Sequence, residues 1–307
     1  MNYSTVPQSK LAFIVSKFPC YDEAFILREL DALSRKREIL IFSLKESNEK
    51  VIHDEAKRLL PNTIYLPNFF SSRLLSAHFF FLFFRNPLKY FRAFFHLVFG
   101  NLKSPEFLIK NLALFPKAVY MARQMEIQNV GHIHAYWATY PASVALVISE
   151  LTQIPYSLTG HAHDIYLNTT HLDTKIERAK FVSTCTSQNK DYLRKIAPNY
   201  AEEKILVNYH GLDLEKFWVN GKKRNETFEI LSVGTLNPHK GFQYFLDSLA
   251  ILKNKNLHFH ATIIGGGLVT KWNWDFSDGN TSTGNSATHS YSKAGKYIVK
   301  INCDGKY

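Results

Sequence analysis

A strand–helix–strand pattern in residues 130–166 constrains the fold of this chain more than any other stretch. A short β-type run at Val130–Ala135 precedes an apolar, small-residue helical stretch at Tyr140–Leu151, and a second strand follows at Ile154–Thr159. Three such elements within ~30 residues form a βαβ unit, whose crossover makes the two strands parallel. Because ligands bind beyond the carboxyl ends of the strands in open parallel sheets, we expect chemistry at the polar residues that follow these strands.

Histidines cluster near both strand ends. His132 and His134 lie in the first strand, and His161, His163 and Asp164 follow the second. A spacing of two points both rings of a strand pair to one side. This leaves open a metal-dependent hydrolase that uses the two His-x-His pairs together with Asp164. Neither pair has the carboxylate spacing of a known metal motif, so we expect no metal site.

The alternation of strands and helices continues through most of the chain and predicts an α/β fold. Further strands are expected at 11–16, 38–44, 63–66, 181–186, 204–209, 228–233 and 258–264. Helices between consecutive strands are the signature of a doubly wound parallel sheet. The chain has 307 residues, which exceeds the usual size of one domain. A polar, basic segment at Trp218–Thr227 indicates a linker.

The composition changes abruptly near the C-terminus. Lys271–Tyr307 is rich in Ser, Thr, Gly, Asn and Tyr and contains short alternating runs such as Lys296–Asn302. This is the texture of an all-β sandwich, although ~40 residues are about half of such a module. We therefore expect an N-terminal parallel-sheet domain, an incomplete second Rossmann-like domain and a short all-β fragment, over residues 1–217, 227–267 and 268–307.

The net charge and the cysteine content indicate which partners and which cellular compartment the sequence favours. The net charge is +11 and the sequence pI is about 9.4, which favours anionic partners. We do not expect nucleic acid among them, because no binding motif for it occurs and the basic residues are spread along the chain. Three scattered cysteines argue for a reducing compartment. The first residues lack the pattern of a signal peptide and no run of eighteen uncharged apolar residues occurs, so we expect a cytoplasmic location.

Residues 69–99, which we call the aromatic segment, are dense in phenylalanine. They carry Arg73, Arg85, Lys89 and Arg92 and no acidic residue. Large aromatic side chains are more numerous here than a helical stripe of ~100° can hide. A basic, aromatic helical pair is typical of a surface that lies on anionic lipid; the alternative is that the phenylalanines pack inside the domain. The segment thus predicts peripheral contact with the inner face of the plasma membrane.

Six motifs carry a family likeness, in the order SKFPCYDEAFILREL, HIHAYWATYPASVAL, SLTGHAHDIY, FVSTCTSQNKDYL, YHGLDLEKF and SVGTLNPHKGFQYFLDSLAIL. Together they resemble the group 1 (family 4) glycosyltransferases of bacterial polysaccharide synthesis. These enzymes have the GT-B fold, in which two Rossmann-like domains face each other across a cleft. The likeness covers roughly Leu11–Gly267. The tail WNWDFSDGNTSTGNSATHSYSKAGKYIVKI resembles the second half of a PKD domain, which is a β-sandwich.

The resemblance implies transfer of a sugar from a nucleotide-sugar donor to a glycan or lipid-linked glycan acceptor, with no metal cofactor. His161 matches the family histidine that lies near the primary hydroxyl of the donor sugar and near the acceptor. The resemblance places Gly234, Thr235, Lys240 and Gly265 at the donor phosphates. Thr235 stands where the family has arginine, so it would donate only a neutral hydrogen bond in place of a charge-assisted one.

A second departure concerns the donor side of the site. The family's second domain supplies a pair of glutamates seven residues apart that hold the ribose and the donor sugar, but no glutamate follows Glu229 in this chain. We therefore expect the chain as written to be catalytically silent or nearly so. The alternative to a transferase, besides the hydrolase above, is a non-catalytic remnant that binds carbohydrate or a membrane surface.

Overall fold

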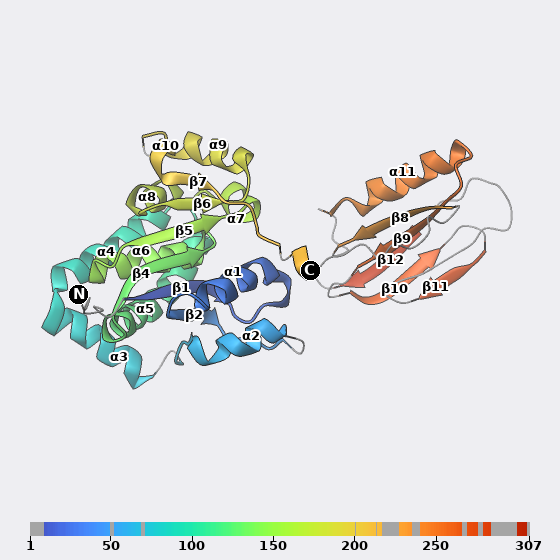
Figure 1. The fold of residues 1–307 in the computed structure, drawn as a ribbon. Helices are drawn as coiled ribbons and strands as arrows, with labels where there is room; N and C mark the ends of the chain where they lie inside the picture. Colours follow the sequence, from blue (N-terminus) through green and yellow to red (C-terminus); the bar gives the residue numbers. More distant parts are fainter. Residues whose placement is uncertain are drawn as a thin grey trace, which may run out of the picture. The chain divides into compact units, whose positions relative to one another are not determined.

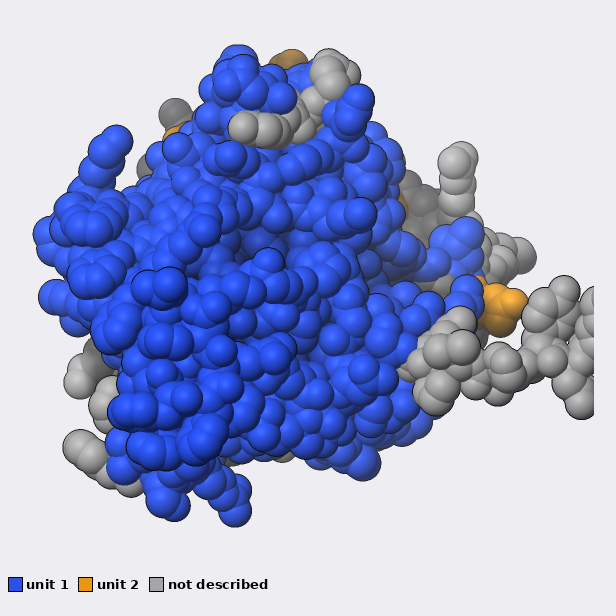
Figure 2. Space-filling model, turned by 90° about the vertical axis from the view of Figure 1, so that its left-hand side faces the viewer, with its two compact units in different colours: residues 1–214 blue, residues 215–307 orange. Residues whose placement is uncertain are grey.

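A parallel sheet organises the first of the two units into which the chain divides, Met1–Leu214 and Glu215–Tyr307 (Figure 1; Figure 2). The computed structural model describes residues 9–49, 52–68, 71–199, 201–212, 214–216, 227–234, 240–265, 269–275, 279–283 and 300–305. The α/β fold predicted from the sequence is confirmed: a seven-stranded parallel sheet is followed by a small two-stranded parallel sheet and a three-stranded antiparallel sheet.

The seven-stranded sheet has the strand order β3-β2-β1-β4-β5-β6-β7, and every neighbouring pair is parallel. Its strands are β1 (Lys10–Lys17), β2 (Ile39–Lys45), β3 (Thr63–Tyr65), β4 (Val130–Tyr136), β5 (Tyr156–Gly160), β6 (Val182–Thr184) and β7 (Ile205–Val207). The first three strands are added in one direction and the next four in the other. The order therefore reverses between β1 and β4, and such a reversal is where open α/β sheets bind ligands.

Helices cover both faces of this sheet (Figure 1). The helical elements of the unit are η1 (Tyr21–Glu23), α1 (Ala24–Ser34), α2 (Asp54–Leu59), η2 (Leu60–Asn62), α3 (Ser72–Phe79), η3 (Phe80–Arg85), α4 (Pro87–Asn101), α5 (Pro105–Ile127), α6 (Tyr140–Thr152), α7 (Ala162–Tyr166), α8 (Leu172–Arg178), α9 (Ser187–Ile196) and α10 (Ala201–Lys204). Helices α1 and α2 pack on one face, and α3, α4, α5 and α6 pack on the other.

Strand β1 shows why the sequence places helices on both faces. Its side chains alternate between the faces, so Ala12 and Ile14 enter the larger core while Phe13 and Val15 enter the smaller one. All four are at most 4% exposed. A continuous apolar run is typical of a parallel strand that is buried on both sides.

The aromatic segment forms α3, the π-helical turn η3 and α4. One side of it is buried in the larger core, through residues such as Phe81 (1% exposed) and Leu97 (3%). The other side is exposed, and its large apolar residues are Leu75, Phe79, Phe83, Phe84, Leu88, Phe91, Phe95 and Phe99, which are between 49% and 80% exposed. The segment is therefore both a core element and a large apolar surface.

The second unit begins near η4 (Leu214–Lys216) and contains two small sheets. Its elements are β8 (Phe228–Val233), α11 (Phe242–Asn254), β9 (Phe259–Ile264), β10 (Val269–Asp275), β11 (Thr281–Thr283) and β12 (Lys300–Gly305). Strands β8 and β9 are parallel, whereas β10 pairs antiparallel with β11 and β12. Leu231, Val233 and Ile264 are 63%, 68% and 51% exposed, so the β8–β9 sheet carries uncovered apolar side chains. The expected linker lies almost wholly outside the described residues.

Candidate functional site

Four rings, one from a helix and three from segments that follow strands, meet beyond the carboxyl ends of the strands. We call Phe25, Trp137, His161 and His210 the strand-end cluster. The centroid of the His161 ring lies 5.0 Å from that of Phe25, 4.7 Å from that of Trp137 and 5.3 Å from that of His210. Phe25 comes from α1, whereas the other three follow β4, β5 and β7. The strand order alone thus gathers residues that are far apart in the sequence.

His161 is the buried member of this cluster. It is 8% exposed, and neither of its ring nitrogens, Nδ1 and Nε2, has a hydrogen-bond partner among the described residues. Burial, and to a smaller extent the neighbouring His210, lowers its pKa from 6.5 to about 4. The imidazole is therefore neutral at pH 7, and both of its ring nitrogens are buried and, in the described part of the chain, unpartnered. The prediction that this histidine is catalytic remains a prediction.

Asp164 holds the backbone around the cluster. Its Oδ1 accepts a hydrogen bond from the His161 backbone N–H at 2.6 Å, and its Oδ2 accepts one from the Ala138 backbone N–H. Burial raises the pKa of this carboxyl to about 6, although the hydrogen bonds from the backbone oppose the rise. Asp164 thus ties the loop after β4 to the start of α7. His163, the weaker candidate beside it, is exposed.

A buried lysine fixes the same loop from the other side. Trp137 has φ of 85°, a left-handed backbone conformation that is rare for a bulky residue. The Nζ of Lys175, which is 1% exposed, donates to the carbonyl oxygens of Ala138 at 2.9 Å and Thr139 at 3.1 Å. Burial lowers the pKa of this amine to about 7. Strained backbone persists where its surroundings hold it in place, and Lys175 and Asp164 do so here.

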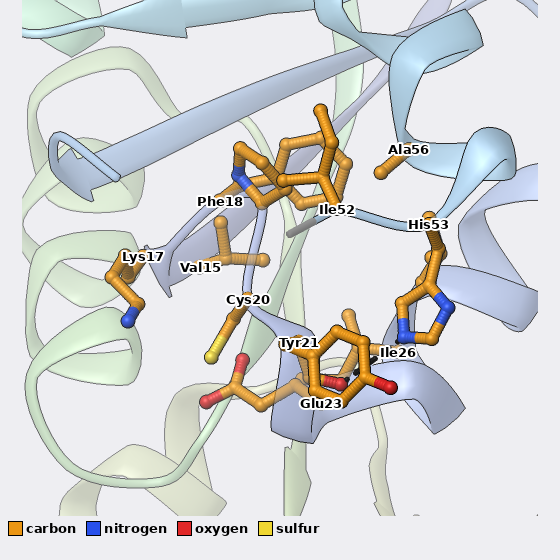
Figure 3. A pocket seen from close by; sticks show the side chains of 12 residues that line it. Val15, Lys17, Phe18, Cys20, Tyr21, Glu23, Ile26, Ile52, His53 and Ala56 are labelled. Carbon is orange, nitrogen blue, oxygen red and sulfur yellow. Dashed lines mark hydrogen bonds between the residues drawn. The ribbon is translucent and has the colours of Figure 1, made fainter. Parts of the chain in front are cut away.

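A pocket opens at the carboxyl end of β1 (Figure 3). It is lined by Val15, Lys17, Phe18, Pro19, Cys20, Tyr21, Glu23, Ile26, Leu27, Ile52, His53 and Ala56. Figure 3 shows the Glu23 carboxylate beside the Cys20 sulfur. Burial raises the pKa of Glu23 to about 7, against the opposing effects of Lys17 and of the Trp137 indole. Through Trp137, the pocket adjoins the strand-end cluster.

The strand histidines do not form a metal site with the cluster. His132 Nε2 and His134 Nδ1 lie 2.8 Å and 2.7 Å from the Ser157 hydroxyl, and His134 Nε2 lies 2.9 Å from the Thr159 hydroxyl. Burial lowers the pKa of His134 to about 3. Within the sheet, both ring nitrogens of His134 and one of His132 thus have hydrogen-bond partners. The described residues hold no group of three or more His, Cys, Asp or Glu side chains that could bind a metal ion.

The structure brings two of the predicted phosphate-loop residues together. The Gly234 N–H donates to the Ile264 carbonyl at 2.9 Å, so Gly234 and Gly265 lie side by side at the carboxyl ends of β8 and β9. Lys240 is exposed and directly precedes Gly241, the N-cap residue of α11, which has φ of 72°. Thr235 lies outside the described residues. Their role in donor binding remains a prediction.

Three residues of the site were not singled out from the sequence. Glu23 opens an amphipathic helix, where an acidic residue is ordinarily explained by the helix dipole. Lys175 sits in LDTKIER, a polar run that is typical of a surface helix. Trp137 had a usable signal, because it directly follows a parallel strand, and this is where ligands bind.

Comparisons with known proteins agree with this architecture. The family model described as "PKD domain" matches residues 249–306, and thus begins within α11, upstream of the expected boundary at 268. No curated protein matches the sequence. Among solved structures, sucrose-phosphate synthase from Thermosynechococcus elongatus aligns with a TM-score of 0.54 and 14% identity, over 85% of this chain and 63% of that chain.

Two further structures align in the same way. The lipopolysaccharide outer core galactosyltransferase WaaB has a TM-score of 0.51 and 16% identity, over 84% of this chain and 61% of that chain. Anabaena HepE in complex with UDP-glucose has a TM-score of 0.52 and 15% identity, over 83% and 60%. The chain therefore spans 60% to 63% of the length of these neighbours. Likeness at such identities is one of fold, and the fold of this chain is that of the GT-B glycosyltransferases.

Proposed function

We propose that this chain is a glycosyltransferase that uses a nucleotide-sugar donor and a glycan or lipid-linked glycan acceptor. The observation that carries the proposal is the buried, unpartnered Nε2 of His161 at the carboxyl end of β5, in a sheet with the GT-B fold. Neighbours of this fold include a galactosyltransferase and a protein solved with UDP-glucose. Both support a nucleotide-sugar donor here.

The residues present suit the chemistry of sugar transfer. Positive charge develops on the donor sugar while the diphosphate departs, and electrostatic groups fixed in advance stabilise both. A neutral His161 orients a sugar hydroxyl through Nε2. In the second unit, Lys240 and the backbone N–H groups at the start of α11 suit the departing phosphates. Thr235, in place of arginine, leaves Lys240 as the cation of this loop.

The proposal places the donor in the second unit, which gives a direct test. Replacing Lys240 with alanine is expected to weaken the binding of UDP to the full chain by roughly ten- to 150-fold, since a hydrogen bond from a charged group contributes about 1.5–3 kcal/mol. Isothermal titration calorimetry with UDP measures this. Lys255→Ala, at the other end of α11, is the matched control. A chain that binds neither UDP- nor GDP-sugars contradicts the proposed function.

A transfer assay tests the role of His161. With UDP- and GDP-sugars and a lipid-linked acceptor extract, we expect a rate several powers of ten below that of an ordinary transferase, because the carboxylates that would orient the donor are missing. The rate that remains should be lost in His161→Ala and kept in His163→Ala, which changes an exposed histidine in the same turn. Equal rates in the two variants would remove His161 from the mechanism.

We further propose that the aromatic segment rests on an anionic lipid surface at the cytoplasmic face of the membrane. Its exposed apolar side chains are accompanied by Arg73, Lys89 and Arg92, and Arg85 pairs with Glu126 at 3.0 Å. Apolar area and cations together are what interfacial binding requires. None of the helices that the structure describes is long and apolar enough to cross a bilayer. Contact at the surface would bring the protein to a lipid-linked acceptor.

A further inference from the structure

Glu23 is a carboxyl that the proposed chemistry does not yet use. It ends η1, which follows β1, and it lines the pocket (Figure 3). Among the described residues no cation forms an ion pair with it. Lys17, the nearest candidate, instead pairs with Glu49 at 2.6 Å. The Trp137 indole, which directly follows β4, faces the carboxyl and is its polar neighbour.

A carboxyl in such surroundings destabilises the folded chain unless a ligand or partner compensates for it. Burial makes its charged form unfavourable, and the pKa of about 7 reports this. A hydrophobic residue would fill the same place beside Ile26 and Leu27 without that cost. Folded chains tolerate unfavourable groups of this kind mainly at functional sites. The carboxyl therefore points to a ligand that satisfies it.

The surroundings define the ligand's chemistry. Glu23 accepts hydrogen bonds, His161 offers an unpartnered ring nitrogen, and Trp137 and Phe25 present aromatic rings. A sugar ring has hydroxyl groups at its edge and apolar C–H groups on its faces, so it matches both kinds of surface. A phosphate does not, because it would meet the Glu23 carboxylate as a like charge.

We propose that Glu23 contacts the acceptor, and that its carboxyl accepts a hydrogen bond from a sugar hydroxyl while the sugar ring lies against Trp137. The proposal rests on the proposed function and adds a residue and a ligand class to it. It assigns the β1 and β4 loops to the acceptor sugar. Donor phosphates are assigned to the second unit.

Tryptophan resonances provide the test. Trp137 is the one tryptophan before residue 215, and Trp218, Trp272 and Trp274 serve as internal references. The full chain is titrated with methyl glycosides of glucose, galactose, mannose and N-acetylglucosamine while the indole N–H signals are followed by NMR. At least one glycoside is expected to shift the Trp137 signal alone.

Glu23→Gln keeps the shape of the side chain and removes its charge. It is expected to weaken glycoside binding about tenfold, as loss of a charge-assisted hydrogen bond does. Asp22→Asn removes the same charge from the exposed neighbouring residue and is the control. The proposal is overturned if no glycoside shifts Trp137, or if Glu23→Gln binds as well as the parent chain.

If Glu23→Gln does not fold, the pH dependence of glycoside binding by the parent chain tests the proposal instead. Glycoside affinity is expected to rise as pH passes through about 7, because Glu23 ionises there. Lys17 and Cys20, which face Glu23, have pKa values raised from 10.5 and 9.0 and do not titrate in this range. The ionisable groups of Asp22 and His53 are removed separately, by Asp22→Asn and His53→Gln. Neither change should shift the pH midpoint of glycoside affinity. An affinity that does not change with pH overturns the proposal.

UDP binding is followed in the same sample, so failure of donor binding is distinguished from failure at Glu23.

Discussion

Replacing Lys175 with methionine is expected to lower the free energy of unfolding of the first unit by about 3 kcal/mol, because two buried carbonyl groups lose their donor at about 1–3 kcal/mol each. These are the carbonyls of Ala138 and Thr139, which receive the Nζ hydrogen bonds of Lys175. Methionine has a similar length and leaves no large cavity. Chemical denaturation followed by circular dichroism measures the change, and Lys195→Met, at an exposed lysine of α9, is the control.

Lys175→Met should also change how the free energy of unfolding depends on pH, which a simple packing defect would not do. The pKa of Lys175 is about 7 in the folded chain and 10.5 in the ordinary state of lysine. Between these values the unfolded chain binds more protons, so the free energy of unfolding rises with pH. This stabilisation is complete above 10.5 and lost as pH falls through 7. Lys175→Met should lack that slope. A variant that keeps both the slope and the stability would show that Lys175 does not brace the loop.

Binding to anionic vesicles is expected to fall at least about 30-fold when Lys89 and Arg92 are both replaced with glutamate, since each lost cation near such a surface contributes about 1 kcal/mol and each added carboxylate is repelled. Both residues lie in α4, among the exposed phenylalanines of the aromatic segment. Arg85 is left unchanged because it pairs with Glu126. Co-sedimentation with phosphatidylserine-containing vesicles at low salt measures the partition.

The control is the same change of charge on the opposite face of the sheet. Arg28 belongs to α1 and Lys36 follows it, and both residues are exposed. Arg28→Glu combined with Lys36→Glu should leave vesicle binding near that of the parent chain. If the two double variants bind alike, net charge and not the aromatic segment governs adsorption. A parent chain that ignores these vesicles contradicts the membrane proposal directly.

The sequence predicted most of the first unit because its strands are apolar runs separated by helices of sufficient length. β1, β2, β4 and β8 lie within about two residues of their expected positions. The aromatic segment was harder to predict, because periodicity shows that one side of a helix is apolar but not how much of the remainder the fold covers. Its exposure depends on α5 and α6, which occupy the buried side alone.

The site was predicted only in part, and the reason is geometric. His161 follows a strand, and strand ends are recognisable from sequence. Glu23 and Lys175 act through neighbours that lie far away along the chain, Trp137 for the first and Ala138 for the second. Only the strand order brings them together. A lysine in a polar helix looks exposed until the structure shows that its side chain points inward.

β1 lies between β2 and β4 in the sheet, and this order has a consequence during synthesis on the ribosome. β2 and β3 emerge soon after β1, so one edge of β1 pairs early. Its other edge waits for β4, about 110 residues later, which takes roughly 5–20 s at 5–20 residues per second. An unpaired strand edge is a template for pairing with other chains, and the aromatic segment is translated within the same interval. The nascent chain therefore exposes its central strand edge and its most apolar surface together, and both need shielding until β4 arrives.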